Sequence, residues 1–155
     1  MKNLVNFVLC LLFLVNTTNS SFAISPDIFI QSTVNRASQV LSENISKEEK
    51  INQLKNIAKE TVDIKGVGFY SLGSIRKTLN KSELNNYSNL FEKYFLKSFS
   101  SRLAEYTNPQ IEVKDKEILN QNYTIVNSIL VATTERPEVK IDWRVYTKDL
   151  NNPLI

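Results

Sequence analysis

Apolar residues change their spacing once along this chain, and that change constrains the fold more than any other feature of the sequence. Up to Tyr106 they recur every three or four residues, as on one face of an α-helix. From Ile111 onward they alternate with polar residues, as on a β-strand with one buried face. The sequence therefore predicts an α+β fold, in which an N-terminal helical layer packs on a curved, mostly antiparallel sheet.

The first 23 residues have the pattern of a cleavable signal peptide. Lys2 precedes an apolar run from Leu4 to Val15, and Ser21-Phe22-Ala23 fits the small-x-small pattern of a cleavage site. The run is far shorter than the ~20 residues that span a bilayer. We expect cleavage after Ala23 and export, which leaves 132 of the 155 residues as one domain, 24–155.

Two missing residue types restrict the chemistry of the expected domain. The chain has no histidine, and its single cysteine, Cys10, lies in the expected signal peptide. The domain therefore lacks the usual zinc ligands, the common nucleophile pairs and any internal disulfide, so it depends on its core for stability. Its net charge, +2 without Lys2, is too small to indicate a nucleic-acid partner.

Four helices are predicted from their caps. Ser25-Pro26 opens the first, which ends before Asn44, and Ser46 with Glu49 forms a capping box for the second. Asp63 is placed to cap a short third helix. Asn80 caps a long fourth helix that reaches Tyr106.

The fourth helix has an unusually aromatic stripe. Its members recur at helical spacing: Leu84, Tyr87, Phe91, Tyr94, Phe95, Phe99, Leu103 and Tyr106. Such a stripe is typical of a large core, and it equally suits the wall of an apolar ligand cavity. Periodicity does not separate the two interpretations.

Three strands follow, each with one apolar face. The first alternates from Ile111, and the others are expected over 122–134 and 138–148. The faces expected to be buried in the last two comprise Tyr123, Ile125, Ile129 and Val131, then Val139, Ile141, Trp143 and Val145. Asn151-Asn152 reads as a turn, with a further strand beginning at Pro153.

Other motifs have structural interpretations. The chain's three glycines, Gly66, Gly68 and Gly73, indicate a bend or a close backbone approach, because their spacing fits neither phosphate-binding glycine pattern. Among the carboxylates, Asp63 reads as a cap and Asp142 as a residue of a solvated strand face. No metal-ligand spacing is present.

The order of several motifs resembles a known family. These motifs are Val62-Asp63, Leu72-Gly73 followed by Arg76-Lys77, the aromatic helix closing in Ala104-Glu105-Tyr106, and the strand Lys140-Ile141-Asp142-Trp143-Arg144. Together they resemble MlaC, the periplasmic lipid-binding component of the Mla phospholipid transport system, also called the toluene-tolerance auxiliary protein. The resemblance covers essentially all of residues 24–155.

The resemblance implies a function without catalysis. An apolar cavity between helices and sheet would take the acyl chains of a phospholipid. The protein would carry the lipid through the periplasm, between an outer-membrane lipoprotein complex and an inner-membrane ABC transporter complex with its periplasmic lipid-binding subunit. No cofactor and no metal are implied.

Two departures from the family pattern are visible. Ser74, Ile75 and Arg76 stand where relatives often carry aromatic residues. Relatives also continue past the equivalent of Asn151-Asn152 with a further strand and a C-terminal helix, and we expect this chain to lack both.

We therefore expect a lipid-binding site and weigh two rivals. The rivals are a small cavity-bearing enzyme that uses carboxylates, and a chaperone-like module whose groove takes protein segments. The residues expected to line the lipid cavity are Phe69, Leu72, Phe91, Phe95, Phe99, Ile125, Ile129, Val131, Val139, Ile141 and Trp143.

Overall fold

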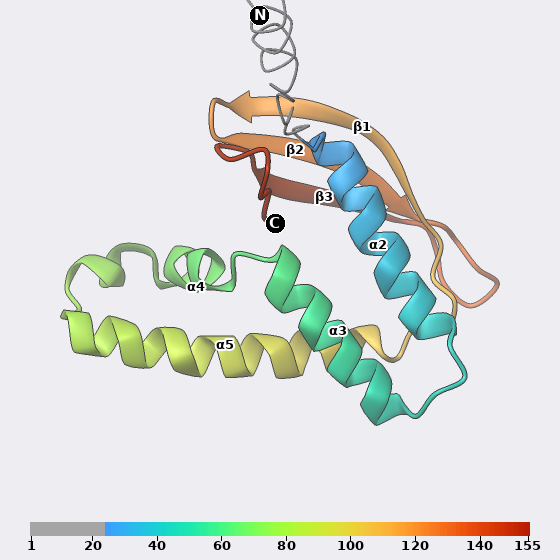
Figure 1. Cartoon of the computed structure of the whole chain (residues 1–155), viewed down its shortest axis with the longest axis horizontal. Coiled ribbons are helices and arrows are strands. Elements are labelled where there is room, and N and C mark those ends of the chain that lie inside the picture. Colours follow the sequence, from blue (N-terminus) through green and yellow to red (C-terminus); the bar gives the residue numbers. More distant parts are fainter. Residues whose placement is uncertain (1–23) are drawn as a thin grey trace, which may run out of the picture.

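A computed structural model describes residues 24–155 (Figure 1). The expected signal peptide, residues 1–23, lies outside the described residues. The elements are α2 (Pro26–Ser42), α3 (Lys47–Thr61), α4 (Ile64–Leu72), the 3₁₀ helix η1 (Gly73–Lys77), α5 (Lys81–Leu103), β1 (Ile111–Asn120), β2 (Tyr123–Leu130) and β3 (Val139–Tyr146). The predicted α+β class, the four helices and the three strands are confirmed.

The predicted caps form in three helices. Ser46 and Glu49 make a reciprocal capping box at α3, and Asn80 with Glu83 makes another at α5. The carboxylate of Asp63 accepts a hydrogen bond from the backbone N–H of Gly66 at the start of α4. The described helices include none that is both long and apolar enough to cross a bilayer.

Two glycines explain the tight connection of α4 to α5. A Cβ at Gly68 would lie 2.8 Å from Cδ1 of Phe91, so only glycine lets the two helices come this close. Gly73 ends α4 with φ +57°, a conformation that side chains disfavour. The expected close approach and bend are therefore both present, at different glycines.

The sheet has the order β1-β2-β3, with both pairs antiparallel. Register shifts interrupt the β1 pairing between Val113 and Asp115 and again near Asn120, and the sheet is visibly curved in Figure 1. After the predicted turn, Leu154 forms a single antiparallel bridge to Tyr146.

The predicted buried face of the second strand is wrong. Val126 is fully buried against Ile30 and Val34 of α2, whereas Ile125 and Ile129 lie on the opposite face of the sheet. The error has a physical cause, since β2 is apolar on both faces. The buried face also carries two hydroxyls, of Thr124 and Ser128, which weaken its hydrophobic signal.

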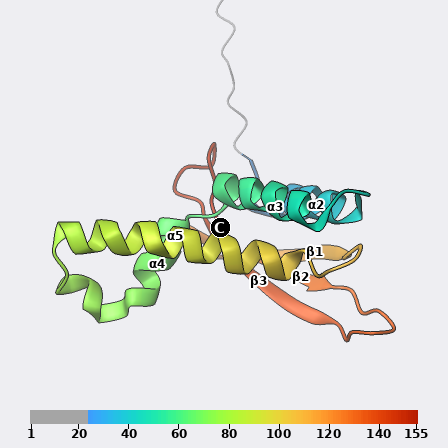
Figure 2. The same cartoon turned by 90° about the horizontal axis from the view of Figure 1, so that it is seen from below.

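Three small clusters make up the core in place of one continuous interior. The first joins α2 to the sheet through Ile30, Val126 and their neighbours. The second joins α2 and α3 through Leu41 and Leu54, and the third joins α3, α4 and α5 around Leu96. Helices α2 and α3 lie side by side, while α4 and α5 extend well beyond the sheet (Figures 1 and 2).

Candidate functional site

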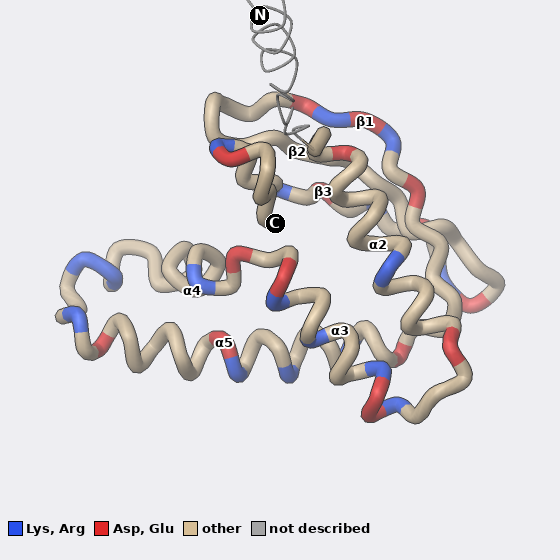
Figure 3. The backbone as a smooth tube through the Cα atoms, viewed as in Figure 1, with Lys and Arg blue, Asp and Glu red and all other residues tan. Residues whose placement is uncertain are grey.

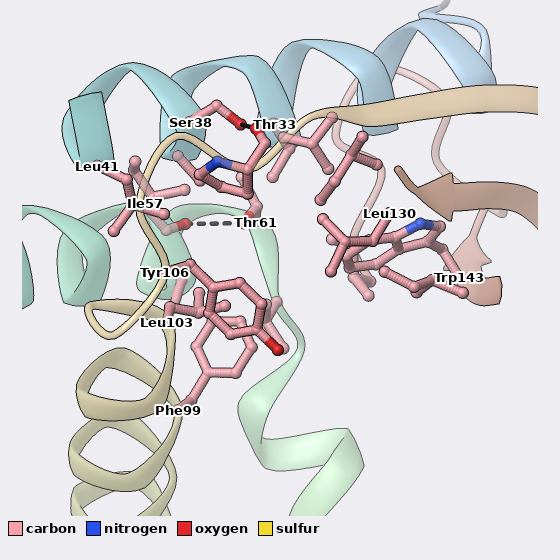
Figure 4. A pocket seen from close by; sticks show the side chains of 18 of the residues that line it. Thr33, Ser38, Leu41, Ile57, Thr61, Phe99, Leu103, Tyr106, Leu130 and Trp143 are labelled. Carbon is pink, nitrogen blue, oxygen red and sulfur yellow. Dashed lines mark hydrogen bonds between the residues drawn. The ribbon is translucent and has the colours of Figure 1, made fainter. Parts of the chain in front are cut away.

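An apolar pocket of about 300 Å³ lies where the three clusters meet (Figure 4). Helices α2 and α3 form one side of the pocket, the C-terminal part of α5 forms a second side, and the sheet forms a third. The pocket is partly open to solvent. Its lining comprises Thr33, Val34, Ala37, Ser38, Leu41, Ile57, Ala58, Thr61, Val62, Val67, Phe95, Phe99, Leu103, Tyr106, Pro109, Ile111, Leu130, Ile141, Trp143 and Ile155.

The serine and threonine hydroxyl groups of the lining are turned to partners within the protein. Thr33 donates to the carbonyl of Phe29 at 2.9 Å, and Thr61 donates to the carbonyl of Ile57 at 2.7 Å. Ser38 donates to the carbonyl of Pro109, which ties α2 to the start of the sheet. These contacts leave mainly carbon facing the cavity, as Figure 4 shows for Thr61.

Trp143, the largest side chain of the sheet wall, also has its polar group hydrogen-bonded within the protein. The indole N–H of Trp143 donates to the hydroxyl of Ser128 at 2.8 Å, and that hydroxyl donates to the carbonyl of Ile141. The ring is thereby fixed with its polar edge satisfied and its carbon face available. A pocket with this wall favours an aliphatic occupant over a polar one.

A ladder of aromatic rings joins the pocket to the far part of α5. Tyr87, Phe91, Phe95 and Phe99 stack in sequence, with centroid separations of 5.7, 6.2 and 5.3 Å. Their spacing of four residues places them on one side of the helix. Phe95 and Phe99 reach the pocket, while Phe91 packs on Gly68.

The aromatic stripe therefore has two roles. Its inner rings line the cavity, and its outer rings hold α4 against α5. Phe95 and Phe99 also pack against the core cluster around Leu96, so the same rings serve the core and the pocket wall. Tyr94 belongs to neither group, since 69% of its surface is exposed.

The structure gathers only some of the residues predicted for the site. Four line the pocket, namely Phe95, Phe99, Ile141 and Trp143. The others do not: Phe69, Leu72, Phe91, Ile125, Ile129, Val131 and Val139. Among these, Phe69 lies beside Lys65, whose ammonium is 5.6 Å from the ring centroid, and Val139 is 46% exposed.

Helices α2 and α3 supply lining residues that the sequence reasoning did not select. Val34, Ala37 and Leu41 recur at helical spacing in the sequence of α2, and all three line the pocket. Such spacing indicates a buried face, but it does not show that this face borders a cavity. From β2, Leu130 lines the pocket in place of Ile129, because the buried face of that strand is the opposite one.

No side chain lining the pocket is charged. The three carboxyl groups with lowered pKa lie elsewhere: Asp27 beside Lys116, Glu49 in its capping box and Asp149 in the turn. Asp142 accepts a hydrogen bond from Asn127 on the other face of the sheet. Residues 24–155 contain no cluster of carboxylates that would hold a metal ion.

Comparisons with known proteins agree with this fold. The family model described as MlaC protein matches residues 31–153. A solved structure of the phospholipid-binding protein from Ralstonia solanacearum, in complex with a phospholipid, superposes with a TM-score of 0.66. The two sequences are 12% identical, over 83% of this chain and 73% of the other. Among curated proteins, none matches the chain.

Proposed function

Since the chain belongs to the MlaC family, we propose that it binds a phospholipid through the pocket between α2, α3, α5 and the sheet. The observation that carries the proposal is the chemistry of the pocket wall. No lining side chain is charged, and the hydroxyls of Thr33, Ser38 and Thr61 are bonded to backbone carbonyls. Such a wall offers an acyl chain dispersion contacts, and it offers a polar ligand few partners.

The pocket volume fits part of a lipid. About 300 Å³ lies at the lower end of the range for ligand pockets. Each methylene that leaves water contributes about 0.8 kcal/mol, so an acyl segment of several carbons gains affinity from burial alone. Because the pocket is partly open, the headgroup would remain in solvent while the chain enters.

A carrier role follows from the same chemistry. A lipid that moves between two membranes through water needs its chains covered and no bond broken. We propose that this protein is a periplasmic shuttle between an outer-membrane lipoprotein complex and an inner-membrane ABC transporter complex. The family and the phospholipid complex of a protein with the same fold support this role.

Two neighbouring residues of β2 provide a matched test. Leu130 and Ile129 are both half-buried and similar in size, but Leu130 lines the pocket and Ile129 lies on the opposite face. Residues 24–155 would be purified from a bacterial periplasm, and the phospholipid in an organic extract of the protein would be quantified by mass spectrometry. We expect near-stoichiometric phospholipid with the native sequence and with Ile129→Asp, and a loss of about tenfold with Leu130→Asp.

Circular dichroism on each sample separates loss of binding from loss of folding. Equal retention of lipid by folded Leu130→Asp and Ile129→Asp would contradict the assignment of the pocket. Absence of lipid from a folded native sample would contradict the proposed function itself. The carrier role is tested separately by the rate at which the protein moves labelled phospholipid between donor and acceptor vesicles.

A further inference from the structure

The charge of this molecule is unevenly distributed. Residues 64–103, which form α4, η1 and α5 and are called the α-hairpin below, contain seven Lys or Arg and two Glu. The remaining described residues, called the body, contain eleven Lys or Arg and fourteen Asp or Glu. A cationic projection therefore extends from a mildly anionic body, and Figure 3 shows lysine and arginine at its tip.

The charges of the α-hairpin are also unpaired. All three ion pairs of the described residues lie in the body: Arg36–Glu60, Lys114–Glu112 and Lys116–Asp27. No lysine or arginine of the α-hairpin lies within 4.0 Å of any carboxylate side chain among residues 24–155. Between Lys65 and Lys81 the sequence has no acidic residue at all. The projection thus presents positive charge that the molecule itself does not neutralise.

Apolar groups alternate with this charge on one helix face. Leu90, Lys93, Tyr94 and Lys97 follow the spacing that places residues on the same side of α5, and all four are exposed. Leu90 is 58% and Tyr94 is 69% exposed. The face turns away from the contacts of α5, because Phe91 packs on α4 and Leu96 belongs to the core cluster that includes Ala58 of α3.

The tip of the α-hairpin repeats the pattern. Ile75 is 59% exposed and is followed directly by Arg76 and Lys77, with Lys81 at the start of α5. Tyr70 on α4 is 78% exposed. Exposed isoleucine, leucine and tyrosine beside unpaired cations are typical of surfaces that lie at a lipid headgroup layer.

We propose that the α-hairpin docks on an anionic phospholipid bilayer, through the tip and the outer face of α5. An anionic bilayer complements the charge of this surface, because its headgroups supply the ion-pair partners that Arg76, Lys93 and Lys97 lack. An acidic protein would satisfy the charges equally well. The bilayer is favoured because tyrosine and aliphatic side chains accompany the cations over the whole face, where a bilayer can take up both.

Docking would also orient the pocket. The aromatic ladder runs along α5 from Tyr87, near the tip, to Phe99 in the pocket wall. A bilayer against the tip of the α-hairpin would therefore lie at the opposite end of this ladder from the pocket.

Vesicle sedimentation tests the inference with two variants of equal charge change. Arg76→Glu, Lys93→Glu and Lys97→Glu are combined in the first, and Lys47→Glu, Lys140→Glu and Lys148→Glu are combined in the second. All six residues are exposed and none forms an ion pair within residues 24–155. The probes are vesicles of phosphatidylcholine alone and of phosphatidylcholine with phosphatidylglycerol.

We expect the native protein to sediment with the phosphatidylglycerol vesicles, and to be released at high salt. Affinity should fall about tenfold or more in the first variant and far less in the second. Equal losses in both variants would overturn the inference, because net charge would then explain binding. Absence of binding to anionic vesicles would also overturn it and leave an acidic protein as the partner.

A further pair of variants separates docking from lipid capture. Leu90→Ser with Tyr94→Ser should weaken vesicle binding while the salt dependence persists. Leu130→Asp, in the pocket wall, should bind vesicles as the native protein does. Loss of vesicle binding in folded Leu130→Asp would show that the pocket, and not the α-hairpin, holds the membrane.

Discussion

The body and the α-hairpin of this protein use similar amounts of helix in opposite ways. In the body, α2 buries six of its 17 residues and α3 buries four of its 15. In the α-hairpin, α5 has 23 residues and buries only Leu96 and Ser100. Helix α2 packs on α3 and on two strands of the sheet, whereas α5 packs on α3 and α4 and leaves its outer face in water.

The difference extends to charge. Lysine and arginine side chains of the body form three ion pairs, two of which join elements distant in sequence, and those of the α-hairpin form none within the described residues. Weak burial and unpaired charge in the same segment indicate a surface that meets a partner. The body supplies the stability, and the α-hairpin supplies an accessible face.

The largest expected effect is a difference in unfolding free energy between the two regions. Leu54 is 1% exposed in the body, and Leu90 is 58% exposed on α5. Leu54→Ala should lower the free energy of unfolding by about 2–5 kcal/mol, through lost burial and a new cavity. Leu90→Ala should change it by less than about 0.5 kcal/mol.

Urea denaturation of the two variants measures both values. The Leu-to-Ala change is identical, so helix propensity and side-chain volume cancel between them. Similar losses in the two variants would show that the outer face of α5 is as well packed as the interior of the body.

An intermediate effect concerns how the α-hairpin holds itself together. Gly68→Ala places a Cβ 2.8 Å from the ring of Phe91. Alanine is a better helix former than glycine by about 1 kcal/mol, so the steric cost and the propensity gain oppose each other. In the native background we expect the steric cost to exceed the gain, and the protein to lose stability.

Removal of the Phe91 ring should reverse the sign of the stability change caused by Gly68→Ala. In a Phe91→Ala background, Gly68→Ala should stabilise by up to about 1 kcal/mol, because only the propensity gain remains. The measurement is a double-mutant cycle on unfolding free energies. If Gly68→Ala changed stability in the same direction in both backgrounds, contact with Phe91 would not determine its effect. Gly68 would then not set the distance between α4 and α5.

Much of the fold could be predicted from local signals in the sequence. The starts of α3, α4 and α5 follow from Ser46, Asp63 and Asn80, whose side chains satisfy the first N–H groups of each helix, whereas α5 ends at Leu103 and not at the predicted Tyr106. The alternation from Ile111 predicted the sheet. These signals depend on a few consecutive residues, so they do not require knowledge of the tertiary structure.

The site could be predicted only in part, because cavities depend on contacts between distant segments. Phe95 and Phe99, predicted from an aromatic stripe, line the pocket, but the same stripe contains Tyr94, which faces solvent. On β2 the two faces carry similar apolar content, so alternation left the choice between Ile129 and Leu130 undetermined. The packing of α2 on the sheet determines which face of β2 is buried. This contact joins segments far apart in the chain, so a local sequence pattern does not reveal it.

The smallest expected effect tests whether the ion pairs of the body contribute measurably. Asp27, in the first turn of α2, accepts hydrogen bonds from Ser25 and from Lys116 of β1, at 2.5 Å each. The hydrogen bond from Lys116, followed by that from Ser25, lowers the pKa of Asp27 from 3.8 to about 2. The folded state therefore favours the ionised carboxylate and links the first helix to the edge strand.

The lowered pKa fixes the sign of the pH dependence. Ionised Asp27 contributes stability that is fully present above about pH 4 and is lost as the pH falls toward about 2. Because the side chain is 37% exposed, solvent screening should limit the contribution to about 1 kcal/mol or less. Asp27→Asn should thus cost stability at pH 6, and its difference from the native protein should shrink as the pH approaches 2.

Urea denaturation at several pH values between 2 and 6 measures this difference. Lys116→Met provides the second arm, since it removes the same ion pair from the other side. At pH 6 the two changes should be less than additive, because each one alone already breaks the contact. Full additivity would show that the pair is not formed in solution, and the body would then resemble the α-hairpin in leaving its charges to water.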